Sequence, residues 1–208
     1  NEKEDIKALI HSIFDEIVEY QLGTEDVIER YRNVKNAPSK PFVLWQLEFP
    51  RVFYENGGFD IVIGNPPYIG ERKHKDAFLA VQSGSLSKYY LGRMDFFYFF
   101  FHLALDLLKK DGICSLITTN YFTTALGGKL LRTDLKQRAD IMELVNFNES
   151  KVFNSAAGQH NMITMFKKGK NDKLAKTILS NVDGALTPNE IEAILHEGTG
   201  SIVNMINH

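Results

Sequence analysis

The residues with the clearest chemical potential are Asn65-Pro66-Pro67-Tyr68, which follow the apolar run Phe59–Gly64. A residue before proline is driven toward extended backbone angles, and proline itself has no N–H to donate. The turn therefore presents two hydrogen-bond acceptors at fixed positions, the side-chain oxygen of Asn65 and the carbonyl of Pro66, with the flat ring of Tyr68 beside them. This set suits a planar substrate that carries an NH2 group.

The turn and its flanks resemble the catalytic segment of amino-methyltransferases that use S-adenosylmethionine. The resemblance is strongest from Asp60 to Tyr68 and runs from about Phe42 to Lys168. Within this group the chain is similar to the DNA adenine-N6 methyltransferases whose recognition domain follows the catalytic one. It looks most like the combined type II restriction–modification enzymes, because the segment Trp45 to Phe53 has close counterparts there.

The resemblance implies methyl transfer to the exocyclic amino group of adenine. That nitrogen is a poor nucleophile because its lone pair is delocalised into the ring. Hydrogen bonds to the Asn65 side chain and the Pro66 carbonyl would strengthen as positive charge develops on the nitrogen, which stabilises the transition state. An adenine in double-stranded DNA must leave the stack to reach this site, and Tyr68 would then stack on the flipped base.

The resemblance also implies further pocket residues. Phe153, in the loop before the last strand of the domain, would supply the second stacking face for the flipped adenine. Asp95 and Phe96, together with Asn65, would line the pocket of the methyl donor. Simpler alternatives exist, because a loop phenylalanine can pack on the core and an acidic residue favours the start of a helix.

A basic stretch follows the turn closely. Arg72, Lys73 and Lys75 are candidate contacts to DNA phosphates, and the alternative is a solvated loop. The histidines show no metal-ligand spacing, so we expect no metal site.

Composition restricts the setting more than the function. The chain has 208 residues, 44% hydrophobic and 24% charged, with a net charge of −2, so no overall basic footprint indicates a nucleic-acid partner. The single cysteine, Cys114, excludes a disulfide within the chain and favours a reduced, cytoplasmic setting in a prokaryote. No apolar run approaches the length of a membrane helix. Because the chain begins at Asn1 rather than Met, we expect a piece of a longer polypeptide.

Hydrophobic periodicity and turn residues predict the elements. We expect helices at 2–20, 24–34, 95–110 and 126–138, a break at 37–41, an irregular aromatic segment at 42–54, and strands at 59–64, 113–118, 141–147 and 161–166. Asp111-Gly112 should end the third helix, and Thr187 to Glu190 should cap a short late one. The alternation of strands and helices predicts a parallel sheet, with the last strand antiparallel because its connection holds no long helix.

These elements predict an α/β fold, which by resemblance is the catalytic half of a partial Rossmann-like S-adenosylmethionine-dependent methyltransferase fold behind an N-terminal helical segment. We expect three parts: helical residues 1–41, the catalytic half at 42–169, and a hinge with the start of a target-recognition region at 170–208. Glycine-rich cofactor turns follow a strand and open a helix, and neither Gly23 nor Gly57-Gly58 does so. The main S-adenosylmethionine motif is therefore expected elsewhere in the parent polypeptide, and this chain alone should be inactive.

Two other functions remain open at this stage. Enzymes that methylate the glutamine side-chain amide of release factors share the Asn-Pro-Pro-Tyr turn, because a carboxamide is also a planar NH2 carrier. A non-catalytic binding module that keeps the fold is the second alternative.

Overall fold

The computed structural model describes residues 2–22, 24–36, 43, 45–153, 159–170, 174–197 and 201–206. The chain divides into two compact units, Asn1–Asn56 and Gly57–His208, and each is described by itself. Within the described ranges, no helix combines the length and the apolar character that a membrane crossing requires.

The first unit is helical, as predicted. Helices α1 (Glu2–Leu22) and α2 (Glu25–Lys35) are joined by Arg32, whose guanidinium donates to both carboxylate oxygens of Glu19 at 2.8 and 2.7 Å. The aromatic segment predicted to be irregular instead forms two short helices, α3 (Trp45–Glu48) and α4 (Pro50–Tyr54). Pro50 starts the second one, because the first position of a helix needs no N–H. The expected break at 37–41 lies outside the described residues.

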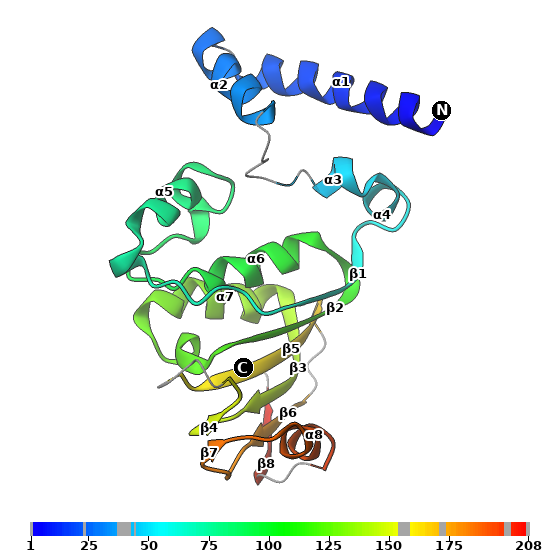
Figure 1. Cartoon of the computed structure of the whole chain (residues 1–208). Helices are drawn as coiled ribbons and strands as arrows, with labels where there is room; N and C mark the ends of the chain where they lie inside the picture. Colours follow the sequence, from blue (N-terminus) through cyan, green and yellow to red (C-terminus); the bar gives the residue numbers. More distant parts are fainter. Residues whose placement is uncertain are drawn as a thin grey trace. The chain divides into compact units, whose positions relative to one another are not determined.

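The second unit is built on one six-stranded sheet (Figure 1). Its strand order is β1 (Phe59–Gly64), β2 (Leu108–Thr119), β5 (Asn161–Lys168), β3 (Ala139–Asn146), β6 (Leu174–Leu179) and β8 (Ser201–Ile206). The β1/β2 and β3/β6 pairs are parallel, whereas β5 is antiparallel to both of its neighbours, β2 and β3. The predicted antiparallel fourth strand is thus confirmed, and it is inserted between β2 and β3.

The sheet continues beyond the segment predicted as a hinge. Lys167 and Lys168 belong to β5, and β6 and β8 extend the same sheet, with β8 antiparallel to β6. A separate pair of short strands, β4 (Ser150–Lys151) and β7 (Gly184–Ala185), joins the chain before β5 to the chain after β6. Within the part predicted at 170–208, β6 and β8 therefore belong to the same sheet as the predicted catalytic half.

Helices α6 (Phe97–Leu107) and α7 (Lys129–Arg138) lie on the same side of the sheet (Figure 1). Smaller helical elements are η1 (Glu71–Lys73), α5 (Lys75–Ser83), η2 (Ser87–Tyr89), η3 (Asn120–Thr123), η4 (Leu126–Gly128) and α8 (Pro188–Glu197). The predicted cap of α8 is confirmed. The Thr187 amide donates to Glu190 Oε2 at 2.7 Å, and the Glu190 amide donates to Thr187 Oγ1 at 3.3 Å.

The predicted end of α6 was wrong. The helix stops at Leu107, and residues 108–112 already belong to β2. Leu108 pairs with Phe59 and Ile113 pairs with Ile61, so β2 advances five positions there while β1 advances two. Asp111 sits at φ 63° in this irregular stretch. Gly112 passes so close to β1 that a Cβ there would lie 2.8 Å from the Phe59 carbonyl oxygen. Asp111-Gly112 therefore shapes a strand irregularity rather than a helix end, because pairing with β1 outweighs the local helix signal.

The core lies between the aromatic helix α6 and the sheet. Its fully buried side chains include Phe97, Phe101, Leu105 and Phe166, with the Phe101 and Phe166 rings stacked at 6.1 Å. One expectation fails at β1, which the sequence predicts to be buried. Ile61 and Ile63 are 66% and 80% exposed, because no described element of Gly57–His208 covers that face of the strand.

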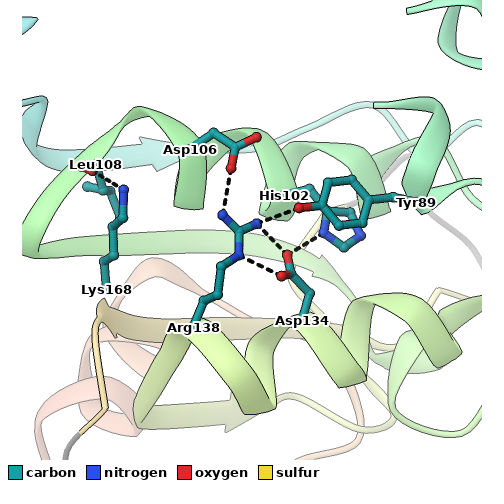
Figure 2. A network of polar contacts seen from close by, with 7 residues as sticks. All are labelled: Tyr89, His102, Asp106, Leu108, Asp134, Arg138 and Lys168. Carbon is teal, nitrogen blue, oxygen red and sulfur yellow. Dashed lines mark hydrogen bonds and ion pairs between the residues drawn. The ribbon is translucent and has the colours of Figure 1, made fainter. Parts of the chain in front are cut away.

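A polar network, buried at His102 and Asp134, joins α6 to α7 (Figure 2). His102 Nδ1 donates to Asp134 at 2.6 Å, and Arg138 donates to both oxygens of the same carboxylate, also at 2.6 Å. Arg138 further reaches Asp106 at 2.6 Å and the Tyr89 hydroxyl at 3.0 Å. The Tyr89 ring stacks on His102 at 3.6 Å, so the network also holds η2 against the helices.

Candidate functional site

The Asn65–Tyr68 turn lies at the carboxyl end of β1, where open α/β sheets bind their ligands. Asn65 is exposed, Pro66 is buried and Tyr68 is half-buried. The edge of the Tyr68 ring packs against Phe97 of α6, with ring centroids 6.0 Å apart and planes at 75°. A buried proline and an anchored ring therefore hold the turn, while the Asn65 side chain faces solvent.

The Tyr68 hydroxyl connects the turn to the neighbouring strand. It lies 3.0 Å from Asn65 Oδ1 and 3.0 Å from the Ile117 carbonyl oxygen of β2. A hydroxyl carries one proton, so it can donate to only one of these oxygens. If it donates to Ile117 and the Asn65 amide is rotated by 180°, Nδ2 donates to the hydroxyl and Oδ1 is released for a substrate. Both hydrogen bonds are then satisfied.

Asp95 is brought beside the turn by a short backbone pairing. Gly70 and Asp95 form an isolated antiparallel β-bridge. Two backbone hydrogen bonds flank it, from the Phe96 amide to the Ile69 carbonyl at 2.9 Å and from the Glu71 amide to the Met94 carbonyl at 3.0 Å. Burial raises the pKa of Asp95, opposed by nearby backbone amides, including that of Phe96. Its Oδ1 is buried and has no hydrogen-bond partner in the described part of the chain.

Asn161, which the sequence did not indicate, lies on the other side of Tyr68. It begins β5 and pairs with Thr119 at the end of β2. It is 1% exposed, and its Nδ2 has no hydrogen-bond partner within the described ranges. Burial raises the pKa of Tyr68, the Asn161 side chain partly offsets this rise, and the charge of Asp95 adds to it. Tyr68 thus lies near the unpaired, buried Asp95 Oδ1 and near the buried Asn161 amide, which interacts with the Tyr68 hydroxyl.

The remaining predicted pocket residues are less closely connected to the turn. Phe96 is half-buried and packs edge-to-face on Phe78, Phe99 and Phe100, with ring centroids 5.5 to 6.1 Å apart. Phe153 is half-buried just after β4 and borders residues 154–158, which lie outside the described ranges. Their roles in cofactor and base binding stay predictions.

The predicted phosphate contacts lie in the loop after the turn. Arg72 and Lys73 are in η1 and Lys75 begins α5, all three exposed. Arg72 and Lys75, but not Lys73, line a pocket of about 660 Å³ together with Glu71, Arg93 and Met94. Arg93 was missed because it lies 21 residues further along the chain than Arg72, in a stretch without a motif. In the described residues, no group of three or more His, Cys, Asp or Glu side chains could hold a metal ion.

Comparison with known proteins identifies the family of the chain. Residues 3–153 match the family described as Eco57I restriction-modification methylase. The type II methyltransferase M.HincII of Haemophilus influenzae is 32% identical over 126 residues, which cover 57% of this chain and 24% of that protein. The Escherichia coli type II restriction enzyme and methyltransferase RM.Eco57I is 26% identical over 101 residues, 47% of this chain and 10% of that protein.

A solved structure supports the fold. The methyltransferase subunit of a type I restriction-modification system from Streptococcus thermophilus superposes with a TM-score of 0.50 at 17% identity, covering 66% of this chain and 31% of that one. The chain spans about a quarter of M.HincII and a tenth of RM.Eco57I. The family match covers most of the chain, including the Asn65–Tyr68 turn, and the chain belongs to the Eco57I restriction-modification methylase family.

Proposed function

We propose that the protein takes part in methyl transfer from S-adenosylmethionine to the exocyclic amino group of adenine in DNA, within a restriction–modification system. The observation that carries this proposal is the exposed Asn65 side chain, held beside the anchored Tyr68 ring at the carboxyl end of β1. The family and the printed names of the relatives, type II methyltransferases and a combined restriction enzyme and methyltransferase, support it.

Asn65 and Pro66 act as acceptors in this mechanism. The Asn65 side-chain oxygen and the Pro66 carbonyl accept the two N–H bonds of the adenine amino group and hold its lone pair toward the methyl donor. As the new N–C bond forms and the bond between the methyl carbon and sulfur breaks, the positive charge passes to the nitrogen and both hydrogen bonds would strengthen. Loss of an N–H proton to solvent then restores a neutral amine. Tyr68 and Phe153 stack on the two faces of the flipped base.

The residues beside Tyr68 fit part of a methyl donor. When bound, S-adenosylmethionine supplies an electrophilic methyl group on a positively charged sulfur. The unpaired Asp95 Oδ1 would accept an N–H or O–H of that ligand, and the buried Asn161 Nδ2 would donate to one of its oxygen or nitrogen atoms. Phe96 would lie at the rim of the same pocket.

We further propose that the 208-residue chain alone transfers little or no methyl. The sequence offers no glycine-rich turn between a strand and a helix for the cofactor, and the β1 face that carries Ile61 and Ile63 is exposed. The remaining cofactor contacts would come from elsewhere in the natural polypeptide.

The test is product analysis with the natural polypeptide that contains this chain. It is incubated with DNA and S-adenosylmethionine carrying a tritiated methyl group, and the digested nucleosides are identified by mass spectrometry. The wild type should form N6-methyladenine. Asn65→Ala should lower the rate by about 10²–10³, the cost of removing one preorganised hydrogen-bond group from a transition state. Label on cytosine with none on adenine would contradict the proposal. Absence of label from DNA, with label on the glutamine of a release factor in a parallel incubation, would favour the protein methyltransferase alternative.

A further inference from the structure

The pocket beside η1 carries a surplus of positive charge. Of its lining residues, Arg72, Lys75 and Arg93 are cationic and Glu71 is anionic, which leaves 3 − 1 = +2. All three cationic side chains are exposed, and in the described part of the chain none has an acidic group within 4 Å. The whole chain has a net charge of −2, so this local excess runs against the overall balance.

Glu71 serves to hold the pocket together rather than to neutralise it. Its carboxylate accepts a hydrogen bond from the Tyr90 hydroxyl and another from the Met94 amide at 3.3 Å. The Glu71 amide in turn donates to the Met94 carbonyl at 3.0 Å. These bonds fix the loop after the Asn65–Tyr68 turn against the 90–94 turn, and so they set the position of Arg93 relative to Arg72.

The backbone at Arg93 is held in an unusual conformation. Its φ is 53°, in the left-handed region that non-glycine residues rarely adopt, and it follows Gly92 at φ 85°. The Arg93 carbonyl rests against Gly127 of η4, where a Cβ would come within 2.3 Å of the oxygen. A residue kept in such a conformation by its surroundings suggests a functional position, and here it places a cationic side chain at the pocket.

The pocket lies within reach of a base bound at the turn. Glu71 and Arg72 are three and four residues beyond Tyr68, and an extended chain of four residues spans at most about 14 Å. One DNA strand carries a phosphate every ~3.4 Å along the helix axis, so this span covers the first few phosphates beside the target nucleotide.

We propose that Arg72, Lys75 and Arg93 form a phosphate-binding pocket for the DNA strand that carries the target base. Arg93 is the new member of this site, and Lys73 is not part of the pocket lining. The inference rests on the proposed function for the identity of the ligand. The pocket positions the DNA strand by electrostatic attraction to its phosphates, independently of the DNA sequence.

The experiment measures binding, so it does not require methyl transfer. The 208-residue chain is titrated into a fluorescein-labelled 20-base-pair duplex, and anisotropy gives Kd at NaCl concentrations from 50 to 300 mM. Each neutralised phosphate contributes about 0.9 to the slope of log K against log salt. Arg93→Gln should therefore lower the slope by about one and weaken binding several-fold at the lowest salt. Lys75→Gln, at a position without backbone strain, should do the same.

Lys136→Gln is the matched control, because it removes the same charge from an exposed position on α7. It should leave the slope unchanged. A wild-type slope in both Arg93→Gln and Lys75→Gln, or an equal loss in Lys136→Gln, would overturn the pocket. Asn65→Ala separates this outcome from the fate of the proposed function. Asn65→Ala should keep the wild-type salt slope. If the slope falls in Arg93→Gln and Lys75→Gln but the methyl-transfer assay gives no N6-methyladenine, the proposed function fails and the phosphate-binding pocket stands.

Discussion

At the scale of single residues, we propose that the Tyr68 hydroxyl orients the Asn65 amide. It lies 3.0 Å from two oxygens but has one proton to give. Donation to the Ile117 carbonyl, with Asn65 Nδ2 donating to the hydroxyl, leaves the Asn65 oxygen as an acceptor for the substrate. Tyr68 would then act twice, through its ring on the base and through its hydroxyl on Asn65.

Tyr68→Phe separates these two roles. The ring stays, so we expect base binding and KM to change little. The amide loses one hydrogen bond worth about 0.5–1.5 kcal/mol, so kcat should fall roughly three- to tenfold. Methylation kinetics with the natural polypeptide check this, with Tyr68→Ala as the comparison that also loses the ring and should raise KM. A Phe variant as damaged in KM as the Ala variant would argue against an orienting hydroxyl.

At the scale of elements, the His102–Asp134–Arg138 network fixes α6 to α7. Burial alone would raise the pKa of Asp134, but hydrogen bonds from His102 and Arg138 outweigh it and hold this pKa at about 2. Burial lowers the pKa of His102, so its ring is neutral at pH 7 and donates Nδ1–H to the carboxylate. The same contacts raise the pKa of Arg138.

Stability should therefore fall with acid in two steps. Because the folded pKa of His102 lies below its ordinary value near 6.5, the unfolded chain takes up the proton first as pH falls through that value. The contribution of Asp134 is complete above its ordinary pKa of 3.8 and is lost as pH falls toward 2. A shift of this size corresponds to about 2 kcal/mol.

Asp134→Asn tests the second step. We expect a loss of about 2 kcal/mol at pH 7, because Arg138 loses a charged partner, and a flatter pH dependence between 4 and 2. Urea unfolding at a series of pH values measures both. Asp183→Asn, at an exposed position whose carboxylate makes no contact in the described residues, should match the wild type within about 0.5 kcal/mol. An Asp134→Asn curve parallel to the wild type below pH 4 would show that the carboxylate is not stabilised by the network.

The elements that could be predicted are those whose sequence pattern lies within a few neighbouring positions. The β1 run with its proline turn, the antiparallel β5 and the capped α8 were all found, because period, turn residues and caps lie within a few positions of one another. The end of α6 was misplaced because Leu108 pairs with Phe59, far away in the sequence. The addition of β6 and β8 to the sheet also depends on long-range pairing that local patterns do not report.

The same distinction applies to the site. Asn65 and Tyr68 were predicted from four adjacent residues, and the structure places that turn at the end of β1 with the Tyr68 ring packed on Phe97. Asn161 and Arg93 were not found, because each is an ordinary polar residue until β5 or the Gly92-Arg93 turn brings it to the site. Ile61 and Ile63 give the opposite error, since their apolar character predicted burial that the described chain does not provide.

At the scale of the whole molecule, Asn1–Asn56 and Gly57–His208 form separate compact units, and every residue of the turn and the basic pocket belongs to the second. Both buried clusters of the described chain also lie in that unit. The residues proposed to bind the base and the phosphates therefore all lie in Gly57–His208.

The central claim is that Asn65 accepts a hydrogen bond from the amino group of adenine. A double-mutant cycle tests it directly. Two duplexes carry either adenine or purine opposite an abasic site, and Kd for each duplex is measured with the wild-type chain and with Asn65→Ala. We predict that wild type prefers adenine over purine, which lacks the amino group, and that Asn65→Ala removes this preference, with a coupling free energy of about 1 kcal/mol. Equal preference for adenine in both proteins, and hence no coupling, would contradict the account.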